Sequence, residues 1–293
     1  GVMDGPFELE DIAAMYGADS HRALRRFGVE QKDSIRPCDH GRENLAGAGA
    51  RRPDKLRCLR ADAPARAGRI LCEEAARVPK RDGSRPKLGL GTDDVSKAYR
   101  RTFSSSPGYT VVYVYAPATS RVRAFTMPGF NYGLVPAVYA FNSITDATAS
   151  FCRLLGAICT VHYFDDFATL GESGAAQHAL WRWHELLLFP MARKKHVPRA
   201  PALQWCGVVT DFTRLVREGI ILIYVSEERR KSVMADIHAA SLFCPPRVAS
   251  ALLGRLSFSL SWAYGRFGRA ALQPLSRRAE APDCFDGHAD VSL

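Results

Sequence analysis

Apolar and polar residues alternate with a strand-like period in several stretches of the chain. Two stretches rich in β-branched and aromatic residues, 109–116 and 121–126, are separated by a Pro-Ala-Thr-Ser connection and predict a hairpin. Stretches 202–210 and 220–225 predict the two strands of another hairpin. The sequence contains no internal repeat.

Other stretches have the helical period. Apolar residues recur every three or four positions in 136–155 and 175–189, which predicts two amphipathic helices. The pattern is helical again from 226 to about 278, where Ser226 predicts an N-cap and Pro245-Pro246 a break between helices. Helices and strands in this mixture predict an α+β fold.

Two segments carry adjacent aspartates at unusual places. Residues 88–94 predict a strand that ends on Asp93-Asp94 and turns into a helix, and 158–170 predict two short strands hinged at Asp165-Asp166. Aspartate is depleted in strands, and neighbouring like charges repel. Taken singly, each pair has an ordinary explanation as turn residues or as a helix N-cap.

The composition is that of a globular protein that buries a core. The 293 residues are 47% apolar and 24% charged, and neither a membrane-length apolar run nor a signal-peptide pattern is evident. The eight cysteines form no CxxC pair, so we expect Cys152, Cys159 and His162 to lie in the core rather than to bind zinc. We therefore expect a reduced, intracellular protein without membrane contacts.

The net charge of +10 is unevenly placed. Residues 21–91 hold 18 Lys and Arg against 9 Asp and Glu, whereas the first twenty residues hold five acids and no Lys or Arg. Within this basic region, 46–67 lacks a clear period and predicts irregular structure or a short helix. A polyphosphate or nucleic-acid partner and a solvated basic surface both explain such a charge.

The two aspartate segments together indicate metal chemistry. A strand-end carboxylate and a strand-turn-strand with two carboxylates can bring three oxygen ligands to one sheet edge. Hard divalent cations, Mg²⁺ above all, are held by a few carboxylates plus substrate phosphates. Two such ions about 4 Å apart promote in-line phosphoryl transfer. We therefore expect two Mg²⁺ ions, with Mn²⁺ as the alternative.

At these residues the sequence resembles the reverse transcriptases of retroelements. Asp94-Val-Ser-Lys-Ala-Tyr99 is similar to the family's first catalytic motif, and Tyr163-Phe-Asp-Asp166 is similar to its YxDD motif, 71 residues further along. The resemblance implies that Asp94, Asp165 and Asp166 are catalytic metal ligands. Tyr99 matches the aromatic gate that excludes ribonucleotides, where related RNA-copying polymerases place a second Asp.

Weaker matches follow in the family's order. By resemblance, Lys32 and Arg36 would contact the incoming triphosphate, and Tyr132 and Gly133 would line the nucleotide pocket. Lys195 resembles the lysine that protonates departing pyrophosphate. Segments 139–142 and 264–270 resemble tyrosine-recombinase-type retroelements.

The resemblance covers about residues 21–278 and implies a right-hand polymerase with fingers, palm and thumb. The expected parts are an N-terminal extension (1–20), fingers (21–91 and 103–130), palm with a primer-grip hairpin (92–102 and 131–225), a helical thumb (226–278) and a tail (279–293).

The function implied is RNA-directed DNA synthesis by a nuclear retrotransposon protein. Its partners would be dNTPs, a primed RNA or DNA template and further retroelement domains. Two alternatives stay open: another two-metal phosphoryl-transfer enzyme (a nuclease or an RNA-dependent RNA polymerase), and a non-catalytic nucleic-acid-binding relic of a polymerase.

Overall fold

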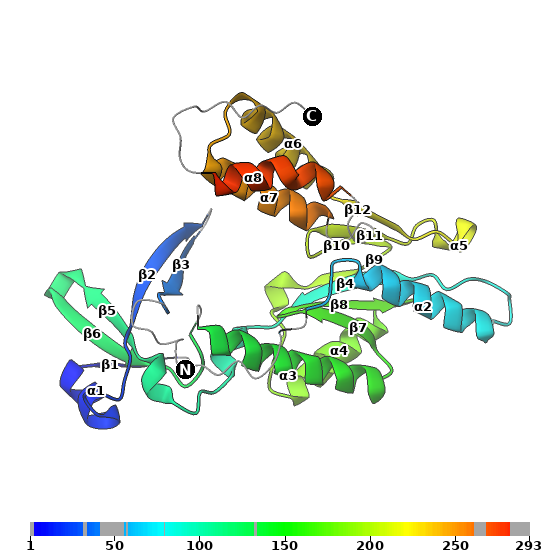
Figure 1. Cartoon of the computed structure of the whole chain (residues 1–293). Coiled ribbons are helices and arrows are strands. Elements are labelled where there is room, and N and C mark those ends of the chain that lie inside the picture. The colour runs from blue at the N-terminus through cyan, green and yellow to red at the C-terminus, as the bar shows by residue number, and fades with distance from the viewer. Residues whose placement is uncertain are drawn as a thin grey trace. The chain divides into compact units, whose positions relative to one another are not determined.

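The protein has a mixed α+β structure, as expected. The structure, a computed structural model, describes residues 3–31, 34–41, 56, 58–78, 80–131, 134–260 and 268–281 (Figure 1). Within these ranges there are three β-sheets and eight α-helices, and none of these helices combines the length and the apolar character of a membrane span.

The chain divides into two compact units, each built from separated segments. Unit 1 comprises Gly1–Cys58, Asp94–Gly156 and Trp181–Lys194, and unit 2 comprises Leu59–Asp93, Ala157–Leu180 and Lys195–Leu293.

Unit 1 contains a five-stranded sheet. Its strands, in spatial order, are β1 (Asp4–Phe7), β6 (Arg121–Thr126), β5 (Val112–Ala116), β2 (Leu24–Gln31) and β3 (Ser34–Asp39). The predicted β5–β6 hairpin is confirmed, although its first strand begins later because Pro107–Thr110 forms a 3-10 turn, η2. Helix α1 (Leu9–Tyr16) buries Ile12 against Val111 and Ala124.

A long helix, α3 (Val135–Leu154), completes unit 1 and confirms the helix predicted from 136–155. Its N-terminal turn packs Leu134 and Ala137 against Leu24 of β2. The helix predicted after the first aspartate pair is shorter than expected, because it consists of one 3-10 turn, η1 (Ala98–Arg101).

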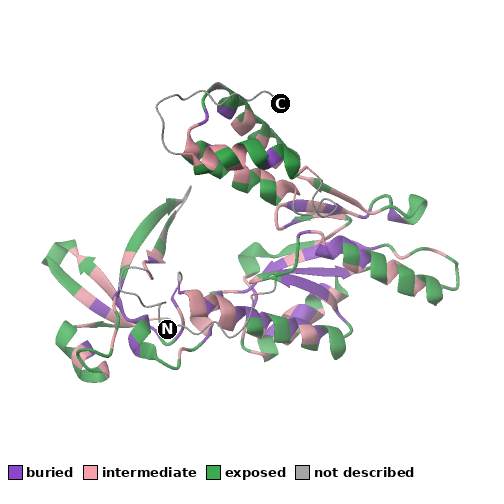
Figure 2. Cartoon of the chain, viewed as in Figure 1, coloured by how far each residue is buried: buried purple, intermediate pink, exposed green. Residues whose placement is uncertain are grey.

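Unit 2 is built around a four-stranded sheet. Its strands, in spatial order, are β7 (Cys159–Tyr163), β8 (Asp166–Gly171), β4 (Gly89–Asp94) and β9 (Val197–Ala200). The strands predicted in 158–170 and 88–94 are thereby confirmed, and Figure 2 shows their burial in purple. Helix α4 (Ala175–Leu186) begins in unit 2 and ends in unit 1.

Helix α2 (Ala63–Arg77) is longer than the sequence pattern predicted for its region. It packs on the β7–β8 sheet, and Gly68 leaves room for the Phe212 ring, which would lie 2.6 Å from a Cβ at this position. Of the stretch 46–67, residues 46–55 and 57 lie outside the described residues.

The prediction of a single strand over 202–210 is wrong. A two-residue turn at Cys206 and Gly207 divides it into β10 (Ala202–Trp205) and β11 (Val208–Asp211), and β12 (Leu222–Val225) adds a third strand. Both turn residues have a positive φ, 47° and 75°, as a type I′ hairpin requires. The short helix α5 (Leu215–Glu218) connects β11 to β12.

The helical region predicted after this sheet is confirmed, and its described residues form three helices: α6 (Glu227–Leu242), α7 (Pro246–Leu260) and α8 (Gln273–Glu280). Ser226 caps α6 by accepting a hydrogen bond from the Arg229 backbone N–H at 3.4 Å, and Pro245-Pro246 separates α6 from α7. Residues 261–267 and 282–293, with most of the 264–270 segment and of the tail, lie outside the described residues. The seven described cysteines are free thiols.

Candidate functional site

The Tyr163–Asp166 segment forms the tip of the β7–β8 hairpin. Tyr163 and Asp166 are directly paired, so Phe164 and Asp165 make a two-residue loop. Phe164 has a φ of 53°, which the favoured two-residue hairpin turns require at this position. A bulky residue in this region is strained by about 1–3 kcal/mol, and such strain gathers at functional sites.

Buried contacts hold this tip in place. The indole Nε1–H of Trp205 donates a hydrogen bond to the backbone carbonyl oxygen of Asp166 at 3.3 Å. His162 and Phe167 are the next paired residues of this hairpin, and the His162 imidazole stacks on the fully buried Phe167 ring with ring centroids 5.3 Å apart. Because the strands are fixed, the half-buried Asp165 and the exposed Asp166 occupy defined positions at the hairpin tip.

The two carboxylates create a negative field that reaches the next hairpin. The pKa of the Cys206 thiol is raised from 9.0 to about 12, first by burial and then by the negative charges of Asp166 and Asp165. A divalent cation would be attracted to this field.

The two aspartates of β4 have different surroundings. Asp93 is buried: its Oδ1 lies 2.7 Å from Nδ1 of His196, and its Oδ2 accepts a hydrogen bond from Nε2 of Gln177 at 2.8 Å. Gln177 also donates to the carbonyl oxygen of Val197 at 2.9 Å. Asp93 therefore ties β4 to β9 and α4, which gives it a structural role.

Asp94 ends β4, and its side chain is largely buried. Its backbone carbonyl oxygen accepts a hydrogen bond from the N–H of Ala192 at 2.7 Å, and the next residue forms an isolated bridge to Met191. The N-cap explanation for the aspartate pair is wrong, because the residue before η1 is Lys97 and it makes no side-chain cap.

The donor chemistry of Asp94, Asp165 and Asp166 fits Mg²⁺, which prefers carboxylate oxygens. The strand that ends at Asp94 is the hydrogen-bonded neighbour of β8 in the sheet order. In the described part of the chain, no group of three or more His, Cys, Asp or Glu side chains is already assembled closely enough to hold a metal ion. The two Mg²⁺ ions therefore stay a prediction.

Tyr99 lies in η1 and contacts two other aromatic residues, one through its ring and one through its backbone. Its ring meets Phe141 of α3 edge to face, with centroids 5.2 Å apart. Its carbonyl oxygen accepts a hydrogen bond from the N–H of Phe130 at 3.2 Å, and both rings pack on the core of Leu24 and its neighbours. The structure thus brings Tyr99 and the 128–131 loop together.

Gly129 is a functional candidate that sequence reasoning missed. A Cβ on this residue would lie 2.0 Å from the backbone carbonyl oxygen of Arg100, so only glycine allows the loop to approach η1 this closely. The sequence signal was the Pro128-Gly129-Phe130 run, but the match to a known motif drew attention to Gly133 instead.

The remaining predicted residues are placed only in part. Lys32, Tyr132 and Gly133 lie outside the described residues. The backbone of Arg36 is in β3, paired with Val29. Lys195 is exposed, ends the 3-10 turn η4 (Arg193–Lys195) and directly precedes His196, the partner of Asp93.

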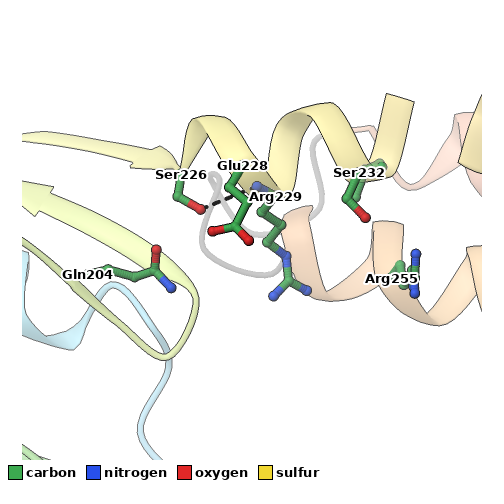
Figure 3. Close-up of a pocket in the computed structure, with 7 residues that line it drawn as sticks. Gln204, Ser226, Glu228, Arg229, Ser232 and Arg255 are labelled. Carbon is green, nitrogen blue, oxygen red and sulfur yellow. Dashed lines mark hydrogen bonds between the residues drawn. The ribbon is translucent and has the colours of Figure 1, made fainter. Parts of the chain in front are cut away.

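A cavity of about 320 Å³ lies between β10 and helices α6 and α7 (Figure 3). It is lined by Gln204, Ser226, Glu228, Arg229, Ser232, Val233 and Arg255. The Arg229 guanidinium lies over the Phe258 ring at 4.4 Å, and its buried Nε has no hydrogen-bond partner within the described residues. Sequence reasoning missed Arg229, because a basic residue in a basic chain gives no distinctive signal.

Comparison with known proteins gives a structural likeness without a sequence relative. No family model and no curated protein matches the sequence. Among 479 matching chains of solved structures is the foamy viral protease-reverse transcriptase in complex with double-stranded DNA, at a TM-score of 0.57 and 12% identity. The match covers 87% of this chain and 38% of that one. The protein therefore has a reverse-transcriptase-like fold and spans well under half of that neighbour's length.

Proposed function

We propose that this protein catalyses template-directed DNA synthesis from dNTPs, as the polymerase part of a retroelement reverse transcriptase. The observation that carries the proposal is the strained Tyr163–Asp166 hairpin tip, which presents Asp165 and Asp166 in a reverse-transcriptase-like fold. The neighbouring strand β4 ends at Asp94, the third proposed ligand.

In this proposal Asp94, Asp165 and Asp166 hold two Mg²⁺ ions. When bound, the ions supply positive charge that activates the primer 3′-OH and stabilises the leaving pyrophosphate. The buried contacts of Trp205 with the hairpin backbone keep the carboxylates in place. Lys195 is proposed to donate a proton to the departing pyrophosphate.

Selection of deoxynucleotides is assigned to Tyr99. A ring beneath the sugar leaves no room for a 2′-OH. The edge-to-face contact with Phe141 supports this role because it restricts the ring, and the hydrogen bond from Phe130 fixes the backbone that carries the ring. Lys32, Arg36, Tyr132 and Gly133 are proposed to contact the dNTP.

The partner is proposed to be a primed RNA or DNA template. The net charge of +10 supports binding to a polyanion, and the structural neighbour was solved with double-stranded DNA. Arg229, whose guanidinium lies beside the cavity of Figure 3, is proposed to meet a backbone phosphate. We expect binding to weaken steeply with salt because phosphate contacts release counterions. A nuclear location and further retroelement domains remain part of the proposal.

The test is extension of a labelled DNA primer on an RNA template with Mg²⁺ and dNTPs, beside two matched variants. Asp165→Asn should lower incorporation about 10²–10³-fold, the scale on which one electrostatic stabiliser contributes to catalysis. Asp211→Asn is the control, since Asp211 also ends a strand and its Oδ1 accepts a local bond from the Thr213 N–H at 2.8 Å, which asparagine keeps.

Each alternative function has its own outcome. Hydrolysis of the nucleic acid without dNTPs would favour a nuclease. Incorporation of ribonucleotides and deoxynucleotides at equal rates, both in the parent and in Tyr99→Ala, would favour an RNA polymerase. Binding of primer-template without incorporation by the parent protein would contradict the enzyme and favour a non-catalytic relic.

A further inference from the structure

Unit 1 contains a second cavity, of about 830 Å³, that the proposed function does not use. Its walls come from η1 and the two residues after it, from the Pro128 loop, from α3 and from the turn that follows α4. All of these segments belong to unit 1.

Six of the ten residues that line the cavity are apolar, and two large ones among them are strongly exposed to solvent. Phe103 is 76% exposed and Leu188 is 77% exposed, and Ile144, Leu187 and Phe189 extend the same surface. Single exposed apolar residues are normal on a protein surface, but several that line one concavity mark a binding site.

Three cations line the same cavity, but the Arg100 guanidinium is largely buried and lies 3.6 Å from the Asp39 carboxylate, so Lys97 and Arg101 supply the charge that faces a ligand. Lys97 is exposed. The Arg101 Nε–H donates a hydrogen bond to the carbonyl oxygen of Ser96 at 3.0 Å, which holds the guanidinium at its Nε atom. Among the described residues that line the cavity none is acidic. The site therefore combines an apolar surface with a positive field.

Thr102 supplies an independent sign of a ligand. It is only 6% exposed, it lines the cavity, and its Oγ1 has no hydrogen-bond partner within the described residues. Leaving a buried hydroxyl unsatisfied costs about 1–3 kcal/mol, so such groups are rare without a reason. An acceptor on a bound molecule would satisfy it.

We propose that this cavity binds an acidic segment of a partner protein. An aromatic or aliphatic side chain of the segment would pack on Phe103 and Leu188, and neighbouring carboxylates would meet Lys97 and Arg101. A carboxylate or a carbonyl oxygen would accept the hydrogen bond from Thr102. The proposal does not depend on the polymerase function.

The lining favours a peptide over a nucleic acid. Phosphates would pair with the cations, but they offer nothing to the aliphatic side chains of Ile144, Leu187 and Leu188. Phe103 and Phe189 offer faces on which bases stack, but the aliphatic part of the wall suits the apolar side chains of a peptide.

The experiment selects displayed random peptides of about ten residues, some 33 Å when extended, on the full chain. Peptides retained by the Leu188→Ser, Lys97→Glu double variant are removed. The expected consensus has Asp or Glu beside Phe, Leu or Trp. Failure to enrich any sequence, or enrichment of basic ones, overturns the proposal.

An enriched peptide, labelled with fluorescein, is then measured by anisotropy against single variants. Leu188→Ser and Lys97→Glu should each weaken binding about tenfold, the equivalent of 1.4 kcal/mol. Leu154→Ser should not, because Leu154 is equally exposed, at 82%, but lies outside the cavity. Equal affinity for the Leu188 and Leu154 variants would overturn the proposal.

Thr102→Val separates a ligand-binding hydroxyl from a structural one. Removing an unsatisfied buried hydroxyl at constant shape should leave the melting temperature equal or higher while it weakens the peptide several-fold. Unchanged affinity would contradict the role of Thr102. A single-stranded DNA that competes with the peptide, and loses affinity in the same variants, would assign the cavity to nucleic acid and overturn the proposal.

Discussion

Gly129→Ala should destabilise unit 1 more than any ordinary surface substitution. The new Cβ would lie 2.0 Å from the Arg100 carbonyl oxygen, and ordinary contact begins at 3.4 Å, so the two backbones must separate by 3.4 − 2.0 = 1.4 Å. The obstacle is backbone, which cannot rotate away as the end of a side chain can.

The separation would break hydrogen bonds that now hold the loop. The Phe130 N–H lies 3.2 Å from the Tyr99 carbonyl oxygen and 3.0 Å from that of Thr102, and the Ser104 N–H donates to Pro128 at 3.1 Å. Lengthening these by more than 1 Å removes them. Losing the bonds of these two N–H donors and overpacking the contact together cost about 2–4 kcal/mol.

Urea and thermal unfolding, followed by circular dichroism, measure this change. Gly254→Ala in α7 is the matched control, because nothing lies within 4 Å of the added Cβ and alanine favours a helix by about 0.5–1 kcal/mol. The reasoning would be refuted if Gly129→Ala unfolded within about 0.5 kcal/mol of the parent, the range of ordinary surface changes.

Three further predictions concern the candidate site. The Cys206 thiol, with a pKa of about 12, should resist iodoacetamide at pH 9, and Asp165→Asn should speed its alkylation by lowering that pKa. The contribution of the raised pKa to the free energy of unfolding is complete below pH 9 and is lost as the pH rises toward 12. Trp205→Phe should cost about 2–3 kcal/mol in urea unfolding, because the hydrogen bond to Asp166 is lost and the smaller ring leaves a cavity in the core. Tyr99→Ala should relax discrimination against ribonucleotides by about 10–100-fold in single-nucleotide incorporation.

Elements with a strong local signal could be predicted from the sequence. The β5–β6 hairpin, α3 and the Ser226 cap follow from periodicity, turn residues and capping, which depend on neighbours in the chain. The Asp165-Asp166 hinge was predicted for the same reason, although the loop residues are Phe164 and Asp165, so Asp166 is the first residue of β8.

The rest depends on contacts between distant residues. The turn at Cys206-Gly207 was missed because the run 202–210 is mostly apolar and cysteine is not a usual residue for a type I′ turn. The resemblance selected Asp94 over Asp93 as a metal ligand, but the structural role of Asp93 could not be predicted from the sequence. What distinguishes them is the bond from His196, 103 residues away, to Asp93.

The incorporation of a single dNTP by Asp94→Asn, beside Asp93→Asn, tests the central claim most directly. The account predicts that Asp94→Asn loses about 10²–10³-fold in incorporation rate. Asp93→Asn should instead lose about 1.5–3 kcal/mol of stability, because its buried carboxylate accepts hydrogen bonds. Incorporation by Asp94→Asn at the parent's rate would contradict the assignment of Asp94 as a catalytic metal ligand.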